Sequence, residues 1–116
     1  MPADVSLKIE PIPGSKPGTV ILRLSGPMTL TSVPPLRALF RGTEPPSHTI
    51  LDLSGVPFMD SAGMSEIINH EVYCRDKRVY LTLAGVTPRV LTMFRTTRLE
   101  QVLTLTPTVE EAESRI

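Results

Sequence analysis

The segment ILDLSGVPFMDSAGM, residues 50–64, contains the features that decide the fold of this chain. Its first part, TILDL at 49–53, is short and largely apolar, as a strand in the middle of a sheet should be. Asp60 and Ser61, both good helix N-caps, then precede residues with apolar positions at helical spacing. The segment therefore predicts a buried strand, a short loop and a helix that begins at about Ser61.

The helix after Ser61 is predicted to have one apolar face and one polar face. The apolar face is predicted to contain Met64, Ile67, Ile68 and Val72, and the polar side chains expected to point elsewhere are Glu66, Asn69, His70 and Arg75. Basic residues at 75–78 follow, where they favour a helix C-terminus.

Strands and helices alternate on both sides of this segment. Strand patterns occur at 20–24, 79–83 and 101–106, and an earlier extended segment precedes the turn at 11–18. A helix is predicted after Pro34 and Pro35, with Thr31 or Ser32 as its cap, and another after the Thr87-Pro88 pair. A short acidic helix closes the chain. This order predicts an α/β domain with a mostly parallel or mixed sheet and right-handed crossovers.

Composition excludes several classes of function. The 116 residues include 12 basic and 12 acidic side chains, and this zero net charge disfavours nucleic-acid and anionic-membrane partners. No run of 18 apolar residues is present, so no membrane insertion is expected. The N-terminus lacks the pattern of a secretory signal and Cys74 is the only cysteine, which together predict a cytoplasmic protein without disulfides.

The sequence contains no recognisable catalytic, metal or cofactor machinery. Ser61 is not in a GxSxG nucleophile elbow, and neither His48 nor His70 is placed to act as its base. His70 and Cys74 have i, i+4 spacing but no third ligand, and no phosphate-binding glycine loop occurs. We therefore expect no enzyme activity, no catalytic residue, no metal and no cofactor.

Residues 50–64 resemble the signature segment of STAS domains, in particular those of bacterial anti-sigma-factor antagonists. The family pattern, D-L-S-x-V-x-x-[IM]-D-[ST]-[SA]-G, is matched in order and spacing by Asp52, Leu53, Ser54, Val56, Met59, Asp60, Ser61, Ala62 and Gly63. The segments VILRLSG, SVPPLRALF and RVYLTLAGVTPRVLTMF are also similar, so the resemblance covers nearly the whole chain.

The resemblance implies a single STAS-like domain over residues 1–116, in which residues 1–17 form an edge strand and a turn. The implied fold is a mixed, mostly parallel sheet of about five strands, with about four helices packed mainly on one face. No oligomeric state is implied.

The resemblance also implies a protein partner that is chosen by phosphorylation. In the family the serine at the position of Ser61 is phosphorylated by an anti-sigma factor that is also a serine kinase, the phosphorylated form no longer binds, and a phosphatase resets the cycle. The small residues Ala62 and Gly63 are expected to let the partner approach closely. The predicted partner-binding residues are Asp60, Ser61, Ala62, Gly63, Met64, Met28 and Thr29.

Two departures from the family pattern keep other interpretations open. Thr29 stands where an acid near the serine is common, and Arg98 stands where a glycine is common. Ser61 could instead be only a helix cap. The chain could then be an interaction subunit that phosphorylation does not switch, such as a scaffold of a stress complex or the partner of a lipid-transport ATPase.

Overall fold

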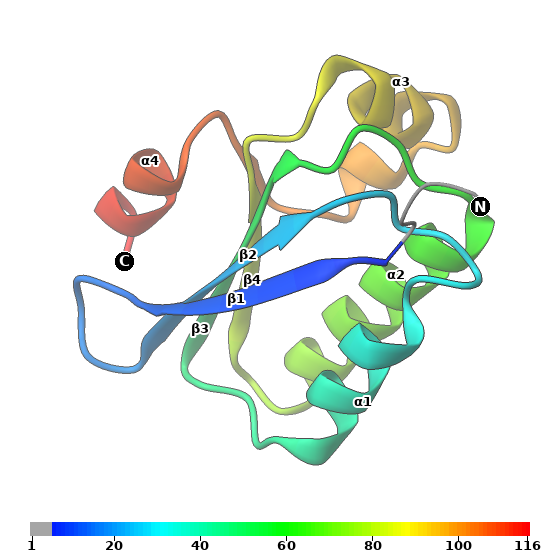
Figure 1. Cartoon of the computed structure of the whole chain (residues 1–116). Coiled ribbons are helices and arrows are strands. Elements are labelled where there is room, and N and C mark those ends of the chain that lie inside the picture. The colour runs from blue at the N-terminus through cyan, green and yellow to red at the C-terminus, as the bar shows by residue number, and fades with distance from the viewer. Residues whose placement is uncertain (1–5) are drawn as a thin grey trace.

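The computed structural model of the chain describes residues 6–116, in which strands and helices alternate (Figure 1). The strands are β1 (Lys8–Pro13), β2 (Thr19–Ser25), β3 (His48–Gly55), β4 (Tyr80–Ala84) and β5 (Leu105–Thr106). The helices are α1 (Pro34–Gly42), α2 (Ser61–Asp76), α3 (Pro88–Thr96) and α4 (Val109–Ser114), and a 3-10 turn, η1, spans Leu99–Gln101. The predicted α/β class is confirmed.

The sheet has five strands in the order β1-β2-β3-β4-β5. β1 pairs antiparallel with β2, and the other neighbours pair in parallel, which confirms a mixed, mostly parallel sheet. β1 lies at one edge, within the segment 1–17, of which residues 1–5 lie outside the described residues. β5 is shorter than the predicted strand at 101–106 because η1 ends at Gln101 and its turn continues through Val102 and Leu103, whose N–H groups both donate to the Leu99 carbonyl.

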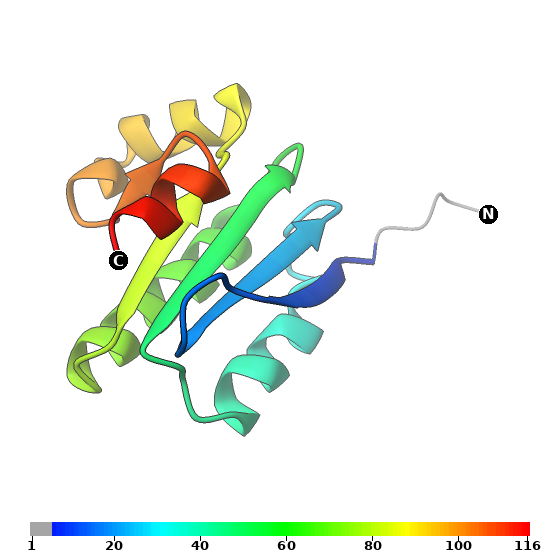
Figure 2. The same cartoon turned by 90° about the vertical axis from the view of Figure 1, so that its left-hand side faces the viewer.

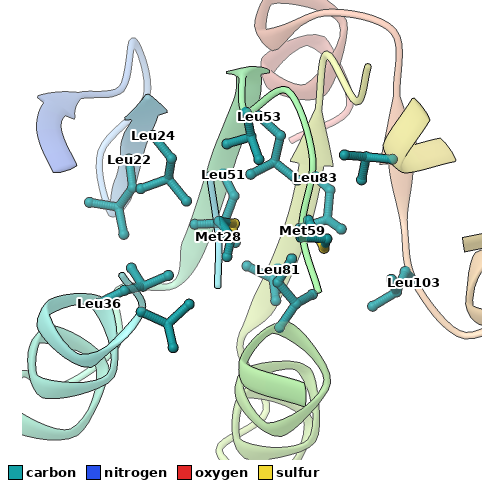
Figure 3. Close-up of a cluster of buried hydrophobic side chains, with 14 of the residues drawn as sticks. Leu22, Leu24, Met28, Leu36, Leu51, Leu53, Met59, Leu81, Leu83 and Leu103 are labelled. Atoms are coloured by element: carbon teal, nitrogen blue, oxygen red, sulfur yellow. The ribbon is translucent and has the colours of Figure 1, made fainter. Parts of the chain in front are cut away.

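Three helices cover one face of the sheet. Crossovers between parallel strands are almost always right-handed, so strands that follow one another in chain order place α1, α2 and α3 on the same side. Figure 1 shows α1 and α2 on the opposite side of the sheet from α4. The large core of this face includes Leu22, Leu24, Met28, Leu36, Leu51, Leu53, Met59, Leu81, Leu83 and Leu103 (Figure 3). Val90 and Phe94 of α3 belong to the same core.

The other face of the sheet is covered in part by α4, which contacts β3, β4 and β5 (Figure 2). The buried residues of this smaller core are Ile21, Ile50, Ala84 and Ala112. The turn between β1 and β2 also reaches α4, because the backbone N–H and the hydroxyl of Ser15 each donate a hydrogen bond to Oε2 of Glu113, both at 2.6 Å. The last helix is thus fastened to the first hairpin.

The start of α1 differs from the prediction. Pro34 and Pro35 occupy the first turn, as predicted, but the N-cap is Val33 and no side chain caps the helix. Ser32 instead holds the preceding loop, since its hydroxyl donates to the Pro27 carbonyl at 2.6 Å and accepts from the Thr29 N–H at 2.7 Å. The predicted cap at Thr31 or Ser32 is therefore wrong.

The buried face of α2 also differs from the prediction. Val72 is 60% exposed, whereas Glu66 and His70 are buried. Glu66 is neutralised by Arg37 of α1, whose Nε lies 2.8 Å from its carboxylate, and the His70 ring stacks on Phe40 with centroids 3.5 Å apart. Polar side chains with partners on α1 can thus replace apolar ones at this contact, and periodicity alone cannot detect such partners.

Arg78 and Arg98 adopt the left-handed backbone conformation, with φ of 60° and 62°. Each follows the end of a helix, where glycine is the usual residue because it has no Cβ. The family glycine at the position of Arg98 is thereby explained as a requirement of the backbone.

Replacement of Arg98 by glycine is expected to raise the free energy of unfolding by about 1 kcal/mol, because it relieves this strain. Urea denaturation of Arg98→Gly measures the effect. The matched control is Thr97→Gly, since Thr97 has an ordinary φ of −94° and should lose stability. Equal losses in both variants would contradict the assignment of strain to Arg98.

Candidate functional site

Three loops meet where the parallel strands end at their carboxyl termini. The loop after β2 is bonded to the loop after β3, because the Met28 N–H donates to the Phe58 carbonyl at 3.1 Å and the Asp60 N–H donates to the Met28 carbonyl at 3.0 Å. The loop after β4 joins them through Thr87, whose hydroxyl donates to the Val56 carbonyl at 3.1 Å. This network fixes the start of α2 relative to all three strands.

Asp60 is the N-cap of α2, which decides between the two predicted caps. Its Oδ1 accepts hydrogen bonds from the backbone N–H groups of Ala62 and Gly63 at 2.9 and 3.1 Å, and its Oδ2 accepts from Leu30 N–H at 3.1 Å. Desolvation raises the pKa of the Asp60 carboxyl, but the bonds from Gly63, Leu30 and Ala62 outweigh it, and the pKa lies below its ordinary value. A charged carboxylate therefore lies beside Ser61.

Ser61 is the first residue of α2 and is exposed. Among residues 6–116, none of the hydrogen bonds involves its hydroxyl, because Asp60 already caps the helix. Ser61 is therefore not the cap of the helix, and its oxygen is accessible for chemistry or for contact with another molecule.

Gly63 and Met28 form an internal contact. Gly63 is buried, and a Cβ added there would lie 2.5 Å from the Met28 carbonyl oxygen and 2.9 Å from the Met28 Cβ. Met28 itself is 0% exposed. The side chain of Met28 is thus unavailable to a partner, contrary to the prediction. The glycine at position 63 is needed for the loop after β2 to pack against α2.

Other predicted residues lie around Ser61 at the surface. Ala62 and Met64 are half-buried, and so is Thr29, whose hydroxyl lies 3.2 Å from that of Ser32. Leu30 is 70% exposed, so the apolar residue that this loop presents to solvent is Leu30.

Phe58 is an exposed residue that the sequence analysis missed. Its side chain is 36% exposed, and the guanidinium of Arg89 lies 5.2 Å from its ring centroid. The sequence signal that could have predicted this exposed residue is a large aromatic side chain in the loop between a strand and a capped helix. Together, Leu30, Ser61, Ala62 and Phe58 define what we call the Ser61 surface.

The histidines and the cysteine lie away from Ser61 and have structural roles. His48 is the first residue of β3, at the amino-terminal end of the parallel strands, whereas Ser61 lies near their carboxyl-terminal end. The Nε2 of His48 lies 2.8 Å from the Thr82 hydroxyl. Cys74 is buried, and desolvation together with the nearby Glu71 carboxylate raises its thiol pKa to about 11. Within residues 6–116, no three His, Cys, Asp or Glu side chains are grouped as metal ligands would be, and none of the helices is long and apolar enough to cross a bilayer.

The fold agrees with that of a known protein family. The family model described as "STAS domain" matches residues 11–112. The chain belongs to the STAS domain family.

The chain resembles several proteins in part or over its whole length. Solute carrier family 26 member 10 of Mus musculus is 40% identical over 58 residues, which are 50% of this chain and 9% of that protein. An anti-sigma factor antagonist from Mycobacterium paratuberculosis has a TM-score of 0.85 at 20% identity, with 100% of this chain and 98% of that one covered. The Bacillus cell fate determinant SpoIIAA in its phosphorylated form has a TM-score of 0.66 at 23% identity, covering 95% and 98%. These structural similarities show the common fold.

Replacement of Gly63 by alanine is expected to lower the free energy of unfolding by roughly 1–3 kcal/mol, because the new methyl group overlaps the Met28 backbone. The control is Gly42→Ala, since a Cβ at Gly42 has nothing within 4 Å and should cost nothing or add up to about 1 kcal/mol of helix stability. Urea denaturation distinguishes the two, and a Gly63→Ala protein as stable as wild type would contradict the close contact.

Replacement of Asp60 by asparagine is expected to cost about 1 kcal/mol at pH 7, because the amide nitrogen that replaces Oδ2 cannot accept from the Leu30 N–H and the capping charge is lost. The Asp60 pKa is lower in the folded chain, so its contribution is complete above the unfolded value of about 3.9 and is lost as the pH falls through the folded value. The gap between wild type and variant should thus close in acid. A gap independent of pH between 7 and 2 would refute a role for the charge.

Proposed function

We propose that this chain is an anti-sigma-factor antagonist that binds an anti-sigma factor with serine-kinase activity, and that phosphorylation of Ser61 abolishes the binding. The observation that carries the proposal is an exposed serine at the first position of α2 whose hydroxyl the fold does not use. Membership of the STAS family and similarity to an anti-sigma factor antagonist support this class of partner. In this role the chain is a non-enzymatic regulator of transcription.

The electrostatics around Ser61 are consistent with a switch that acts at the interface. A phosphate adds about −1.5 to −2 charges next to the ionised Asp60 carboxylate. The positive end of the α2 dipole tolerates an anion, so the helix need not unfold. The added charge and bulk therefore act mainly on the docked partner, by repulsion and by steric overlap.

The apolar side chains of the Ser61 surface strengthen this effect. Leu30 is held near Ser61, because its N–H donates to Asp60, and it is 70% exposed. A partner that covers Leu30 and Phe58 would exclude water from the same area. A phosphate buried there without a cationic partner would be costly, so binding and phosphorylation should exclude one another.

Thr29 favours a second candidate function, that of a STAS interaction subunit without a phosphorylation switch. Thr29 replaces the acid that the family associates with kinase recognition, and its N–H and hydroxyl both lie against the Ser32 hydroxyl inside the loop. The same Ser61 surface would then bind a scaffold partner or a transport ATPase constitutively.

The test mixes the purified chain with an anti-sigma kinase encoded beside its gene, adds ATP, and maps phosphate by mass spectrometry. We expect phosphate on Ser61, and we expect Ser61→Asp to weaken kinase binding at least about tenfold, as measured by calorimetry. Ser114→Asp adds the same charge on α4, at the opposite face of the sheet, and should bind like wild type.

Two further variants separate the switched from the constitutive function. Leu30→Ala removes an apolar contact of the Ser61 surface, whereas Tyr80→Ala removes a comparably exposed side chain at the far end of β4. If Leu30→Ala weakens binding but Ser61→Asp does not, and no phosphate appears, the switch is wrong and the constitutive function holds. If neither variant weakens binding, the Ser61 surface is not the interface.

A further inference from the structure

A cavity lies on the α1 side of the sheet, at the end away from Ser61. It has a volume of about 260 Å³ and lies between β2, the end of α1 and the 43–46 loop. Apolar side chains make up most of its wall, among them Val20, Leu22, Leu39 and Pro45. The stacked rings of Phe40 and His70 also line this cavity. A second cavity of about 290 Å³ is lined by the same two rings.

Two polar side chains of this wall have no hydrogen-bond partner within the described chain. His70 is 5% exposed and Thr49 is 3% exposed, and both line the cavity. Among residues 6–116, none of the hydrogen bonds involves the His70 ring nitrogens or the Thr49 hydroxyl. The polar atoms of both side chains still reach solvent, since the buried side-chain atom without a partner among residues 6–116 is Thr19 Oγ1, and they are therefore free to bond with a polar group of a molecule in the cavity.

The charges of the wall restrict what the cavity can bind. Among the residues that the structure describes, Glu44 of the exposed 43–46 loop is the one carboxylate that lines the cavity, and no lysine or arginine lines it. His70 supplies no fixed positive charge, since burial lowers its pKa and the nearby Glu66 carboxylate only partly opposes this. An anionic head group, such as that of a fatty acid, would lack a counterion there.

We propose that this cavity is a binding site for a small, neutral, mostly aromatic molecule that carries one hydroxyl or similar polar group, which bonds with His70 and Thr49. An apolar cavity of about 150 Å³ is large enough to bind benzene in another protein, so 260 Å³ suits a molecule of one or two fused rings. A mostly apolar pocket with a few converging polar groups is the usual form of a small-molecule site. This inference does not depend on the proposed function of Ser61.

The test titrates 2-naphthol, 2-naphthoate and naphthalene into the isotope-labelled chain and follows the amide resonances by NMR. We expect 2-naphthol to bind with a Kd below about 1 mM and to shift resonances of the cavity wall, and we expect the anionic 2-naphthoate to bind at least about tenfold more weakly. The proposal would be overturned if 2-naphthol caused no shift at concentrations up to about 2 mM, or if 2-naphthoate bound equally well.

Three variants test the location and the hydrogen bond. Leu39→Trp fills the cavity from α1 and should abolish binding, whereas Met93→Trp, at another half-buried helix position outside the cavity, should leave it unchanged. Thr49→Val keeps the shape but removes the hydroxyl, so it should weaken 2-naphthol about fivefold and naphthalene not at all. If Leu39→Trp does not fold, Thr49→Val decides alone. Unchanged 2-naphthol binding in Thr49→Val would then refute the site.

Discussion

The arrangement of the whole carboxyl edge depends on the close approach of Gly63 to the backbone of Met28. That contact leaves no room for a Cβ and allows the loop after β2 to bond with the loop after β3 on both sides of Met28. Asp60 then caps α2 and holds Leu30 with the same carboxylate. Loop, cap and helix are therefore joined by direct contacts, and Ser61 lies at the start of a helix that these contacts hold in place.

These contacts fix the position of Ser61 without using its hydroxyl. Asp60 satisfies the first N–H groups of α2, so the fold makes no demand on the Ser61 hydroxyl. The neighbouring residues that face solvent, Leu30 and Phe58, are apolar, and the residue that touches the core is Met28. One short loop thus supplies both the internal contact, through the buried Met28, and part of the external surface, through the exposed Leu30 two positions later.

Much of this fold could be predicted from the sequence, because strand and helix periodicity, the Pro34-Pro35 and Thr87-Pro88 pairs and the DSAG segment all act locally. The buried face of α2 could not, because Glu66 and His70 are stabilised by Arg37 and Phe40, which come from another helix. The burial of Met28 was likewise unpredictable, since an apolar loop residue can face either a core or a partner. The cap at Val33 escaped prediction because Ser32 bonds backward into its own loop. Local signals therefore give the order of elements, and contacts between elements decide which side chains remain exposed.

The order of strands in the sheet has a consequence for how the protein is made. Each strand pairs with its neighbour in the chain, so the sheet can grow strand by strand while the polypeptide is still being synthesised, with one hairpin or one helical crossover to close at each step. The contact between Ser15 and Glu113 is different, because it joins residues 98 positions apart. It can form only when α4 has been released from the ribosome, so the contact of α4 with the first hairpin must come later than the pairing of β1 with β2.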